Sequence, residues 1–270
     1  MNKKIFTAPY IVWIAGFILI PLLFIVFYGF TDMGGAITFS NISSIAEPTY
    51  LNSLLVSLKL SVISTAVCLL LAYPLAYILS KYSNGKKGFT VFVFILPMWM
   101  NSLLRLLALK TLFEENGVLN IALEAIGLNP VSILGTESAV VIGTVYDYLP
   151  FMLLPIYNSL VKIDKGVIEA AKDLGANSFT VLRKVVIPLS VPGIISGITM
   201  VFVPAVSEFT IASIMGNNKI MLIGNIIERK FINTGEWNIG SGLSIVLMAF
   251  VIISMSVFEK FDKDGGESLI

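Results

Sequence analysis

The chain contains no histidine and only one cysteine, Cys68. Histidine is the side chain that most readily gains and loses a proton near neutral pH, and it is a frequent metal ligand. A single cysteine cannot form an intrachain disulfide or a cysteine metal cluster. Histidine-based catalysis is therefore excluded, and we expect no metal site and no cofactor in this chain.

Charged residues are also scarce, at 13% of 270 residues, and the formal net charge is only +1. The chain has no concentrated basic tract, which argues against binding to nucleic acid. Hydrophobic residues make up 56% of the sequence and the mean hydropathy is +0.90. Because so few polar residues cannot coat a water-soluble domain, the composition predicts a multi-pass membrane protein in contact with the lipid bilayer.

The apolar residues are grouped into stretches long enough to cross a bilayer. A hydrocarbon core about 30 Å thick requires about 20 apolar residues in a helix. Six such stretches lie near residues 10–30, 53–79, 89–109, 138–160, 192–214 and 239–258. None of them shows the strict alternation of a membrane β-barrel strand. The sequence predicts an all-α fold with six transmembrane helices, organised as one transmembrane domain over residues 1–270.

The distribution of lysine and arginine predicts the orientation of these helices, because basic residues are enriched on the cytoplasmic side. Both ends of the chain and the loops at 80–88 and 161–191 fall on one side of the predicted membrane. That side carries most of the basic residues: Lys3, Lys4, Lys81, Lys86, Lys87, Lys162, Lys165, Lys172, Arg183, Lys184, Lys260 and Lys263. We therefore expect both termini to be cytoplasmic and the first apolar stretch to be a retained helix.

The predicted cytoplasmic loop at 161–191 has the pattern of two short helices. Asp164 is a suitable N-cap for the first helix, and Gly175 suits the left-handed position that ends it. Ser178 is a suitable N-cap for the second helix, which we expect to stop before Pro188. The pattern predicts a compact two-helix knob. An alternative interpretation is an amphipathic loop that lies on lipid head groups.

The same loop contains Glu169-Ala170-Ala171-Lys172-Asp173-Leu174-Gly175, followed by Val185-Val186-Ile187-Pro188. This sequence resembles the EAA loop of ABC importer permeases. It implies a type I ABC importer permease fold, in which residues 164–175 form a coupling helix that docks on a separate ATP-hydrolysing subunit. The expected ATPase-coupling residues are Glu169, Ala170, Ala171, Asp173, Leu174, Gly175 and Pro188.

Other segments resemble one branch of this family, the permeases of spermidine/putrescine importers, and in particular the first of their two paired permeases. The similar segments are residues 71–77, 96–99, 148–157 and 203–211. The resemblance implies a subunit that forms half of a polyamine pore. Permeases for iron, phosphonate and thiamine share several of these sequence segments, so transport of one of those small solutes is an alternative to polyamine transport.

The expected partners follow from the same resemblance. The segment Gly85-Lys86-Lys87-Gly88 lacks the spacing and the following serine or threonine of a phosphate-binding loop. ATP and Mg²⁺ are therefore expected on a partner ATPase dimer, and the chain itself is expected to be non-catalytic. A second homologous permease and an extracytoplasmic substrate-binding protein complete the expected assembly in a bacterial inner membrane.

Acidic residues inside predicted spans are candidates for the substrate pathway, because a charge in lipid needs a partner. Asp147 lies near the middle of the fourth span and Glu208 lies in the outer half of the fifth. Carboxylates and aromatic faces suit a linear polyamine through charge-assisted hydrogen bonds and cation–π contacts. The residues predicted to line the pathway are Asp147, Tyr146, Tyr148, Glu208 and Trp99. Alternatively, the two carboxylates form structural ion pairs with Arg105 or Lys59.

Two other classes of protein compete with this interpretation. A secondary transporter driven by an ion gradient would ordinarily show repeated halves, and the first three spans do not obviously repeat in the last three. An intramembrane enzyme would need a nucleophile and a base or a set of metal ligands, whereas the spans contain only scattered carboxylates.

Overall fold

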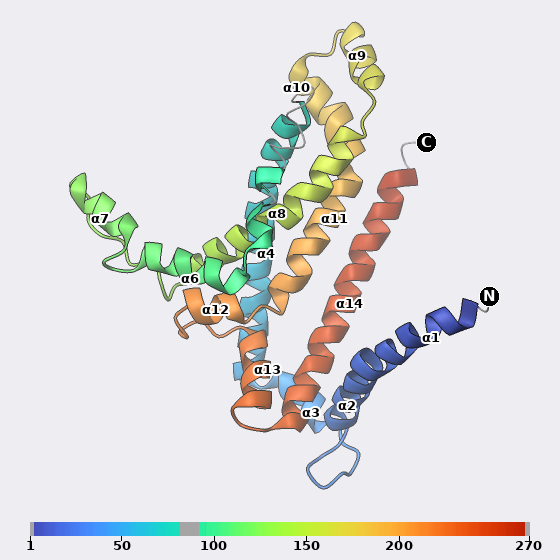
Figure 1. Cartoon of the computed structure of the whole chain (residues 1–270), viewed down its shortest axis with the longest axis vertical. Helices are drawn as coiled ribbons and strands as arrows, with labels where there is room; N and C mark the ends of the chain where they lie inside the picture. Colours follow the sequence, from blue (N-terminus) through green and yellow to red (C-terminus); the bar gives the residue numbers. More distant parts are fainter. Residues whose placement is uncertain (1–2, 82–91, 95, 268–270) are drawn as a thin grey trace.

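The computed structural model describes residues 3–81, 92–94 and 96–267 (Figure 1). Within these residues the regular structure is helical, apart from one isolated antiparallel bridge between Thr31 and Ile37. The long helical elements are α1 (Lys3–Ile14), α2 (Ile20–Gly29), α4 (Pro48–Lys81), α8 (Glu137–Val161), α11 (Ile187–Val206) and α14 (Trp237–Glu267). The all-α prediction is confirmed for this part of the chain.

Five segments among the described residues are long and apolar enough to cross a membrane. They are Pro9–Gly29, Pro48–Lys81, Glu137–Val161, Ser178–Val206 and Trp237–Lys260. They correspond to five of the six predicted spans, and the chain is a multi-pass membrane protein.

The remaining predicted span, 89–109, is not one continuous helix in its described part. A short 3-10 turn, Leu96–Trp99, is followed by α6 (Ser102–Phe113). Asn101 separates them with an extended backbone, and its side-chain oxygen accepts a hydrogen bond from the Leu104 N–H at 3.3 Å. This helix cap starts a new helix where the hydropathy pattern indicated an uninterrupted one. The count of six transmembrane helices is therefore not confirmed, and residues 89–91 and 95 lie outside the described residues.

The fifth predicted span, 192–214, begins earlier and ends earlier than expected. A helical path runs without interruption from α10 (Ser178–Val181) through a π-turn at Leu182–Val186 into α11. In the π-turn the Ile187 N–H donates to the carbonyl of Leu182, five residues back. This wider turn accommodates Pro188 in the first turn of α11, so the predicted helix stop before Pro188 is wrong. The span then ends at Val206, before α12 (Thr210–Met215).

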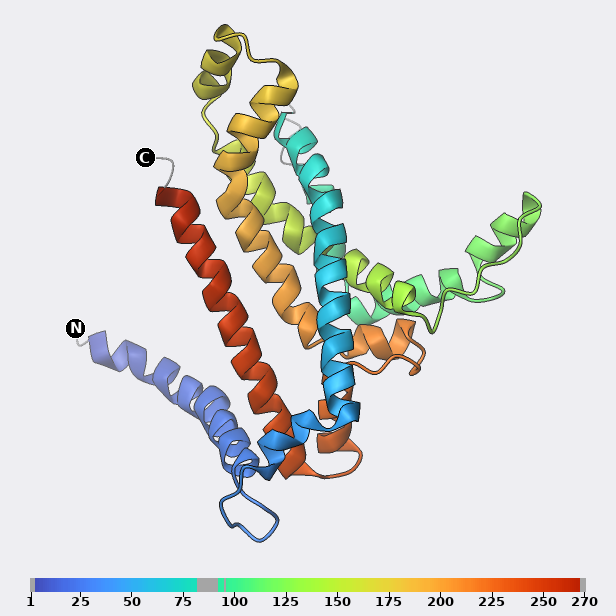
Figure 2. The same cartoon turned by 180° about the vertical axis from the view of Figure 1, so that it is seen from behind.

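Three helices, α4, α8 and α11, pack side by side in the core of the bundle (Figures 1 and 2). Cys68, Ala72 and Ala76 recur every four residues on one face of α4 and are completely buried. They pack in one apolar cluster with Met152 and Ile156 of α8. Cys68 therefore belongs to the helix packing. Small residues at this spacing allow helix backbones to approach closely in a membrane.

Glycine has the same role where α11 meets α8. A Cβ atom at Gly193 would lie 2.5 Å from the Ser159 Cβ and 2.7 Å from the Pro155 carbonyl oxygen. We expect Gly193→Ala to lower the free energy of unfolding by about 1–3 kcal/mol, because the backbone of α8 cannot yield to the added methyl group. The thermal unfolding midpoint of the purified protein measures this effect.

Gly16 provides the matched control for this substitution. Nothing lies within 4 Å of a Cβ atom at Gly16, which is also helical. Gly16→Ala is expected to leave the unfolding midpoint unchanged or to raise it slightly, because alanine favours helix. Equal midpoints for the two variants would contradict the close packing at Gly193.

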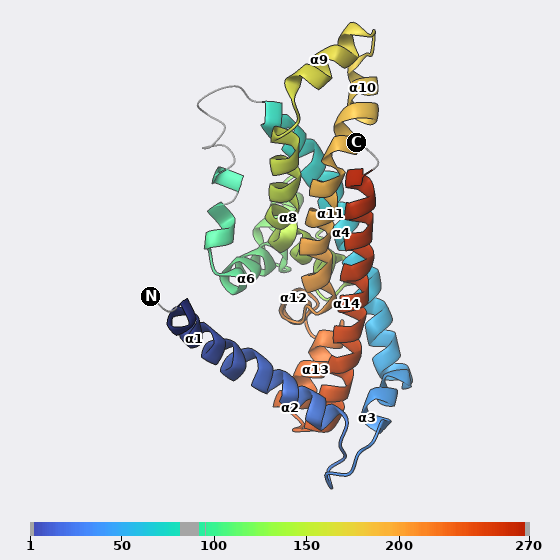
Figure 3. The same ribbon diagram turned by 90° about the vertical axis from the view of Figure 1, so that its right-hand side faces the viewer.

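Several short helices lie at the two ends of the bundle or extend from its side (Figure 1). The helix α9 (Lys165–Asp173) lies at one extremity, toward the same end as the C-terminal part of α14 (Figures 1 and 3). The helices α3 (Ser40–Ser43) and α13 (Ile223–Ile232) lie toward the opposite end. An arm formed by α6 and α7 (Val118–Ala125) projects sideways, and α1 diverges from the bundle (Figures 2 and 3).

Candidate functional site

The predicted knob is formed by α9, α10 and the turn between them. The Asp164 side chain caps α9 and accepts a hydrogen bond from the Gly166 N–H at 2.8 Å. Gly175 ends the helix with φ of +81°, a left-handed conformation that favours glycine. Both predictions are confirmed. The cap of α10 was predicted one residue too late, because Asn177 rather than Ser178 accepts from the Thr180 N–H at 2.8 Å.

The knob has one face on the bundle and one face in contact with solvent. Ile168 and Ala171 pack against the apolar core cluster, which includes Val181 of α10 and Val186 of the π-turn as well as residues of α4 and α8. Leu174 and Phe179 are large apolar side chains that remain 90% and 70% exposed. Of the predicted coupling residues, Glu169, Ala170, Asp173, Leu174 and Gly175 are exposed, whereas Ala171 and Pro188 are partly buried. The motif is therefore displayed on an end of the molecule, where another protein can reach it.

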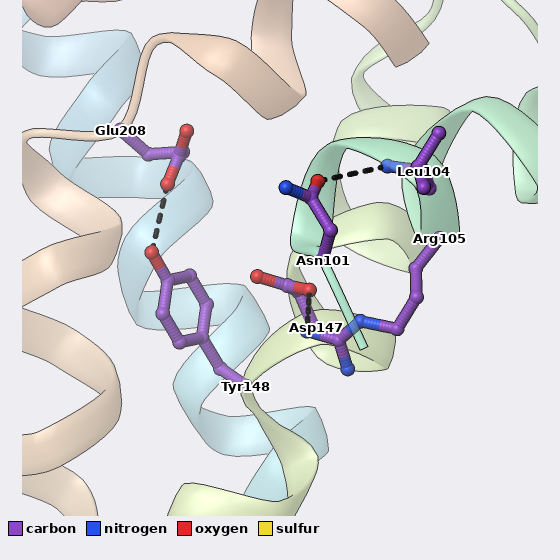
Figure 4. A network of polar contacts seen from close by, with 6 residues as sticks. All are labelled: Asn101, Leu104, Arg105, Asp147, Tyr148 and Glu208. Atoms are coloured by element: carbon purple, nitrogen blue, oxygen red, sulfur yellow. Dashed lines mark hydrogen bonds and ion pairs between the residues drawn. The ribbon is translucent and has the colours of Figure 1, made fainter. Parts of the chain in front are cut away.

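A second candidate region lies inside the helical bundle, around Asp147 of α8. Both Asp147 and Arg105 of α6 are buried. The Arg105 Nη2 donates to the Asp147 Oδ1 at 2.5 Å (Figure 4). The alternative interpretation of Asp147 as one half of an interhelical ion pair is thus realised with Arg105. Lys59 instead contacts Glu137 at 2.6 Å, near the surface of the protein.

Glu208 does not lie in a transmembrane helix, because α11 ends at Val206. It lies in the turn before α12, where its Oε1 accepts hydrogen bonds from the N–H groups of Phe209, Thr210 and Ile211 at 2.8–3.1 Å. Its Oε2 accepts a hydrogen bond from the Tyr148 hydroxyl at 2.7 Å (Figure 4). Glu208 therefore holds the start of α12 and links it to α8.

The charge and the capping role of Glu208 can be separated by substitution. Glu208→Ala removes every acceptor at the start of α12, and we expect a loss of about 1–2 kcal/mol in the free energy of unfolding. Glu208→Gln keeps an acceptor oxygen, so we expect less than about half of that loss. Thermal unfolding midpoints of the two variants check this. Equal losses would contradict a capping role that depends on the oxygen.

The three aromatic candidates occupy different surroundings. Tyr148 is bonded to Glu208, and the Tyr146 ring centroid lies 5.9 Å from the Arg105 Cζ. Trp99 is 77% exposed, and its ring contact within the described residues is with Phe92 at 5.8 Å. The structure thus brings both tyrosines, Asp147 and Glu208 into one region but does not connect Trp99 to it.

Sequence analysis did not identify two polar residues that position the helices around this region. The Ser57 hydroxyl on α4 accepts a hydrogen bond from the Ile223 N–H at 2.8 Å. The Asn225 side chain donates to the Phe209 carbonyl at 2.9 Å and to the Ser213 hydroxyl at 2.8 Å. The regular spacing of serines along α4 was the available signal, because it predicts one polar, buried face.

Known proteins resemble this chain over almost its entire length. It is 37% identical to the Spermidine/putrescine transport system permease protein PotB of Haemophilus influenzae, over 97% of this chain and 94% of that protein. A bacterial ABC transporter involved in the import of alginate has the same fold, with a TM-score of 0.77 and 17% identity over 97% of this chain and 94% of that one. A second structure, of a bacterial alginate ABC transporter in complex with alginate pentasaccharide-bound periplasmic protein, has a TM-score of 0.75. Its sequence identity is 16%, over 94% of this chain and 91% of that one.

These similarities identify the fold as that of an ABC importer permease. They also argue against the two alternative hypotheses, a secondary transporter and an intramembrane enzyme. The model of the family described as "Binding-protein-dependent transport system inner membrane component" matches residues 69–264. The chain therefore belongs to this family and is a non-catalytic permease component of an ABC transporter.

Proposed function

We propose that this chain is the permease subunit of an ATP-driven polyamine importer and forms one half of its pore. The observation that carries this proposal is the 37% identity, over 97% of the chain, with a permease named for spermidine and putrescine. The expected chemistry agrees, since the Asp147 and Glu208 carboxylates lie near Tyr148 (Figure 4) and Tyr146 lies beside Arg105. Polyamines are linear cations that such groups bind by charge-assisted hydrogen bonds and cation–π contact.

The knob is the proposed connection to the motor. Its exposed Leu174 and Phe179 offer apolar contact area, and Glu169 and Asp173 offer charge, on a surface without a partner among the described residues. We assign this surface to docking on an ATP-binding subunit, which holds ATP and Mg²⁺. Movement of that subunit is transmitted through Ala171 and Ile168 to the helices on which they pack. Pro188 lies at the start of α11, where this movement enters the membrane.

The orientation follows from the same assignment. If the knob faces a cytoplasmic ATPase, the C-terminal end of α14, drawn toward the same extremity, is cytoplasmic as well (Figure 1). The N-terminus is on the same predicted side as this loop, and that side carries most of the basic residues, which agrees with a cytoplasmic N-terminus. The opposite end then receives the loaded binding protein. A second, homologous permease is proposed to complete the pore, which lies between the two subunits.

We propose that the substrate passes the region of Asp147, Tyr146, Tyr148 and Glu208, with Trp99 on an exposed surface that lines the same path. Asp147 and Glu208 supply negative charge, and the tyrosine rings supply faces for the methylene chain and ammonium groups. The acidic groups select cations, so an organic anion is disfavoured.

Uptake by the complete complex tests the proposal. The chain is reconstituted in vesicles with its ATPase, its second permease and its binding protein, and labelled spermidine and putrescine are supplied on the binding-protein side. We expect ATP-dependent accumulation of at least one of them. If neither accumulates while another loaded binding protein stimulates the ATPase, the permease assignment stands and the polyamine assignment is wrong.

A further inference from the structure

The Arg105–Asp147 ion pair is incomplete on both sides. A guanidinium group has five N–H donors, and Arg105 uses Nη2 alone. Its Nε and Nη1 atoms are buried and have no hydrogen-bond partner among the described residues. On the other side, the contact uses only the Oδ1 atom of Asp147. Within the described part of the chain, the second carboxylate oxygen accepts no hydrogen bond.

The geometry of this pair differs from that of most structural arginine–carboxylate pairs. Arginine and carboxylate groups favour two parallel hydrogen bonds, and buried ion pairs usually have their remaining donors and acceptors satisfied. The side chain of Arg105 is only 4% exposed, so water at the protein surface does not satisfy its free donors. The single contact leaves acceptor capacity on a buried carboxylate and leaves a buried cation short of partners.

The surroundings of the pair favour a cation. Figure 4 shows Asp147 with Arg105 on one side and the Tyr148–Glu208 pair on the other. The Asp147 and Glu208 carboxylates lie in the same region (Figure 4) and carry like charge, so they repel each other. Arg105 offsets one of these two negative charges. The guanidinium also lies 5.9 Å from the Tyr146 ring, which is an alternative position for a cation.

We propose that Arg105 is an internal cation that occupies the Asp147 carboxylate until an ammonium group of the substrate displaces it. The inference rests on the proposed polyamine function and adds a gating step to it. In the empty pore Arg105 neutralises Asp147. As the substrate arrives, its ammonium group takes the free Oδ2 and then replaces the guanidinium, which moves toward Tyr146. Asp147 has a cationic partner at every stage, and the face of the Tyr146 ring stabilises the displaced guanidinium.

The exchange has a consequence for the pore. Arg105 lies on α6, which begins at the Asn101 cap, and Asp147 lies on α8. Release of the pair frees α6 from a buried ionic contact with α8. The substrate's charge is thereby linked to the position of the α6–α7 arm. A neutral solute cannot displace the guanidinium from Asp147, so the exchange also selects for cations.

Four proteins distinguish exchange from a purely structural pair: wild type, Arg105→Gln, Asp147→Asn and the double variant. Each is assembled with the ATPase, second permease and binding protein, and uptake of labelled spermidine is normalised to assembled complex. Exchange predicts about tenfold lower uptake for Asp147→Asn and for the double variant, because both lack the carboxylate that receives the substrate. A structural pair predicts that the neutral double variant recovers wild-type uptake.

A binding measurement keeps the proposal testable if the double variant does not assemble. Spermidine retained by the purified complex without ATP is expected to rise about threefold or more in Arg105→Gln, because the competing cation is gone. Unchanged or lower retention in assembled Arg105→Gln, or recovered uptake in the double variant, overturns the exchange. Absence of spermidine and putrescine uptake in wild type instead overturns the proposed function, so the two failures are distinguishable.

Discussion

Glu169→Lys is expected to reduce ATP-dependent uptake about tenfold or more while the complex remains assembled. Glu169 is exposed on α9, in the centre of the proposed coupling surface. Reversing its charge places a lysine between Lys165 and Lys172, which are one helical turn away on either side. A surface that presents a carboxylate to its partner would then present a cluster of positive charge. Contact with the ATP-binding subunit should be weakened specifically.

The fold itself should tolerate this substitution. No described residue forms an ion pair within 4.0 Å of Glu169, and substitutions at exposed helical positions usually change stability by less than about 0.5 kcal/mol. Repulsion between the new lysine and the flanking lysines adds only about 0.2–0.5 kcal/mol for each pair. A large loss of uptake with an unchanged unfolding midpoint would therefore report on coupling and not on folding.

Glu124→Lys is the matched control for this experiment. Glu124 is an exposed acidic residue on the short helix α7, which projects from the bundle away from the knob (Figure 1). The same change of charge there is expected to leave uptake within about twofold of wild type. The measurement is uptake per assembled complex together with its ATPase rate. Wild-type uptake by Glu169→Lys, or equal losses in both variants, would rule out the coupling role.

The knob was predictable from sequence because its determinants are local. An acidic cap at Asp164 and a left-handed glycine at Gly175 act within a few residues of the helix they bound, and both have the predicted geometry. The proline rule failed at Pro188 because a π-turn absorbs the missing hydrogen bond. Such a turn is rare in α-helices, so the proline rule does not anticipate it.

The sequence predicted which residues belong to the region around Asp147, but it did not predict how they contact one another. Charge in an apolar stretch marked Asp147 as needing a partner, and Arg105 was one of two candidate cations. The choice between Arg105 and Lys59 depends on how α6 and α8 meet, and Arg105 and Asp147 are 42 positions apart. Glu208 was assigned to a span because apolar residues flank it on both sides. Its role as the cap of α12 becomes visible only where α11 ends.

Asp147→Asn is expected to lower the free energy of unfolding by about 3–5 kcal/mol. The substitution leaves the Arg105 guanidinium buried and removes its carboxylate partner, and two of its nitrogens already lack partners among the described residues. Glu137→Gln is the matched control, because it breaks a pair with Lys59 whose side chains are 55% and 40% exposed. An exposed pair contributes about 0–1 kcal/mol, so the control should be nearly neutral. Thermal unfolding of the purified proteins makes the comparison.

The double variant Arg105→Gln/Asp147→Asn separates the stability of this region from its function. Because it removes both buried charges, it should recover most of the stability that Asp147→Asn loses. If Asp147 were needed only for folding, uptake would recover together with stability. If the carboxylate receives the substrate, stability returns and uptake does not. A double variant as unstable as Asp147→Asn would mean that the ion pair is not the cause of the loss, and would contradict the electrostatic explanation.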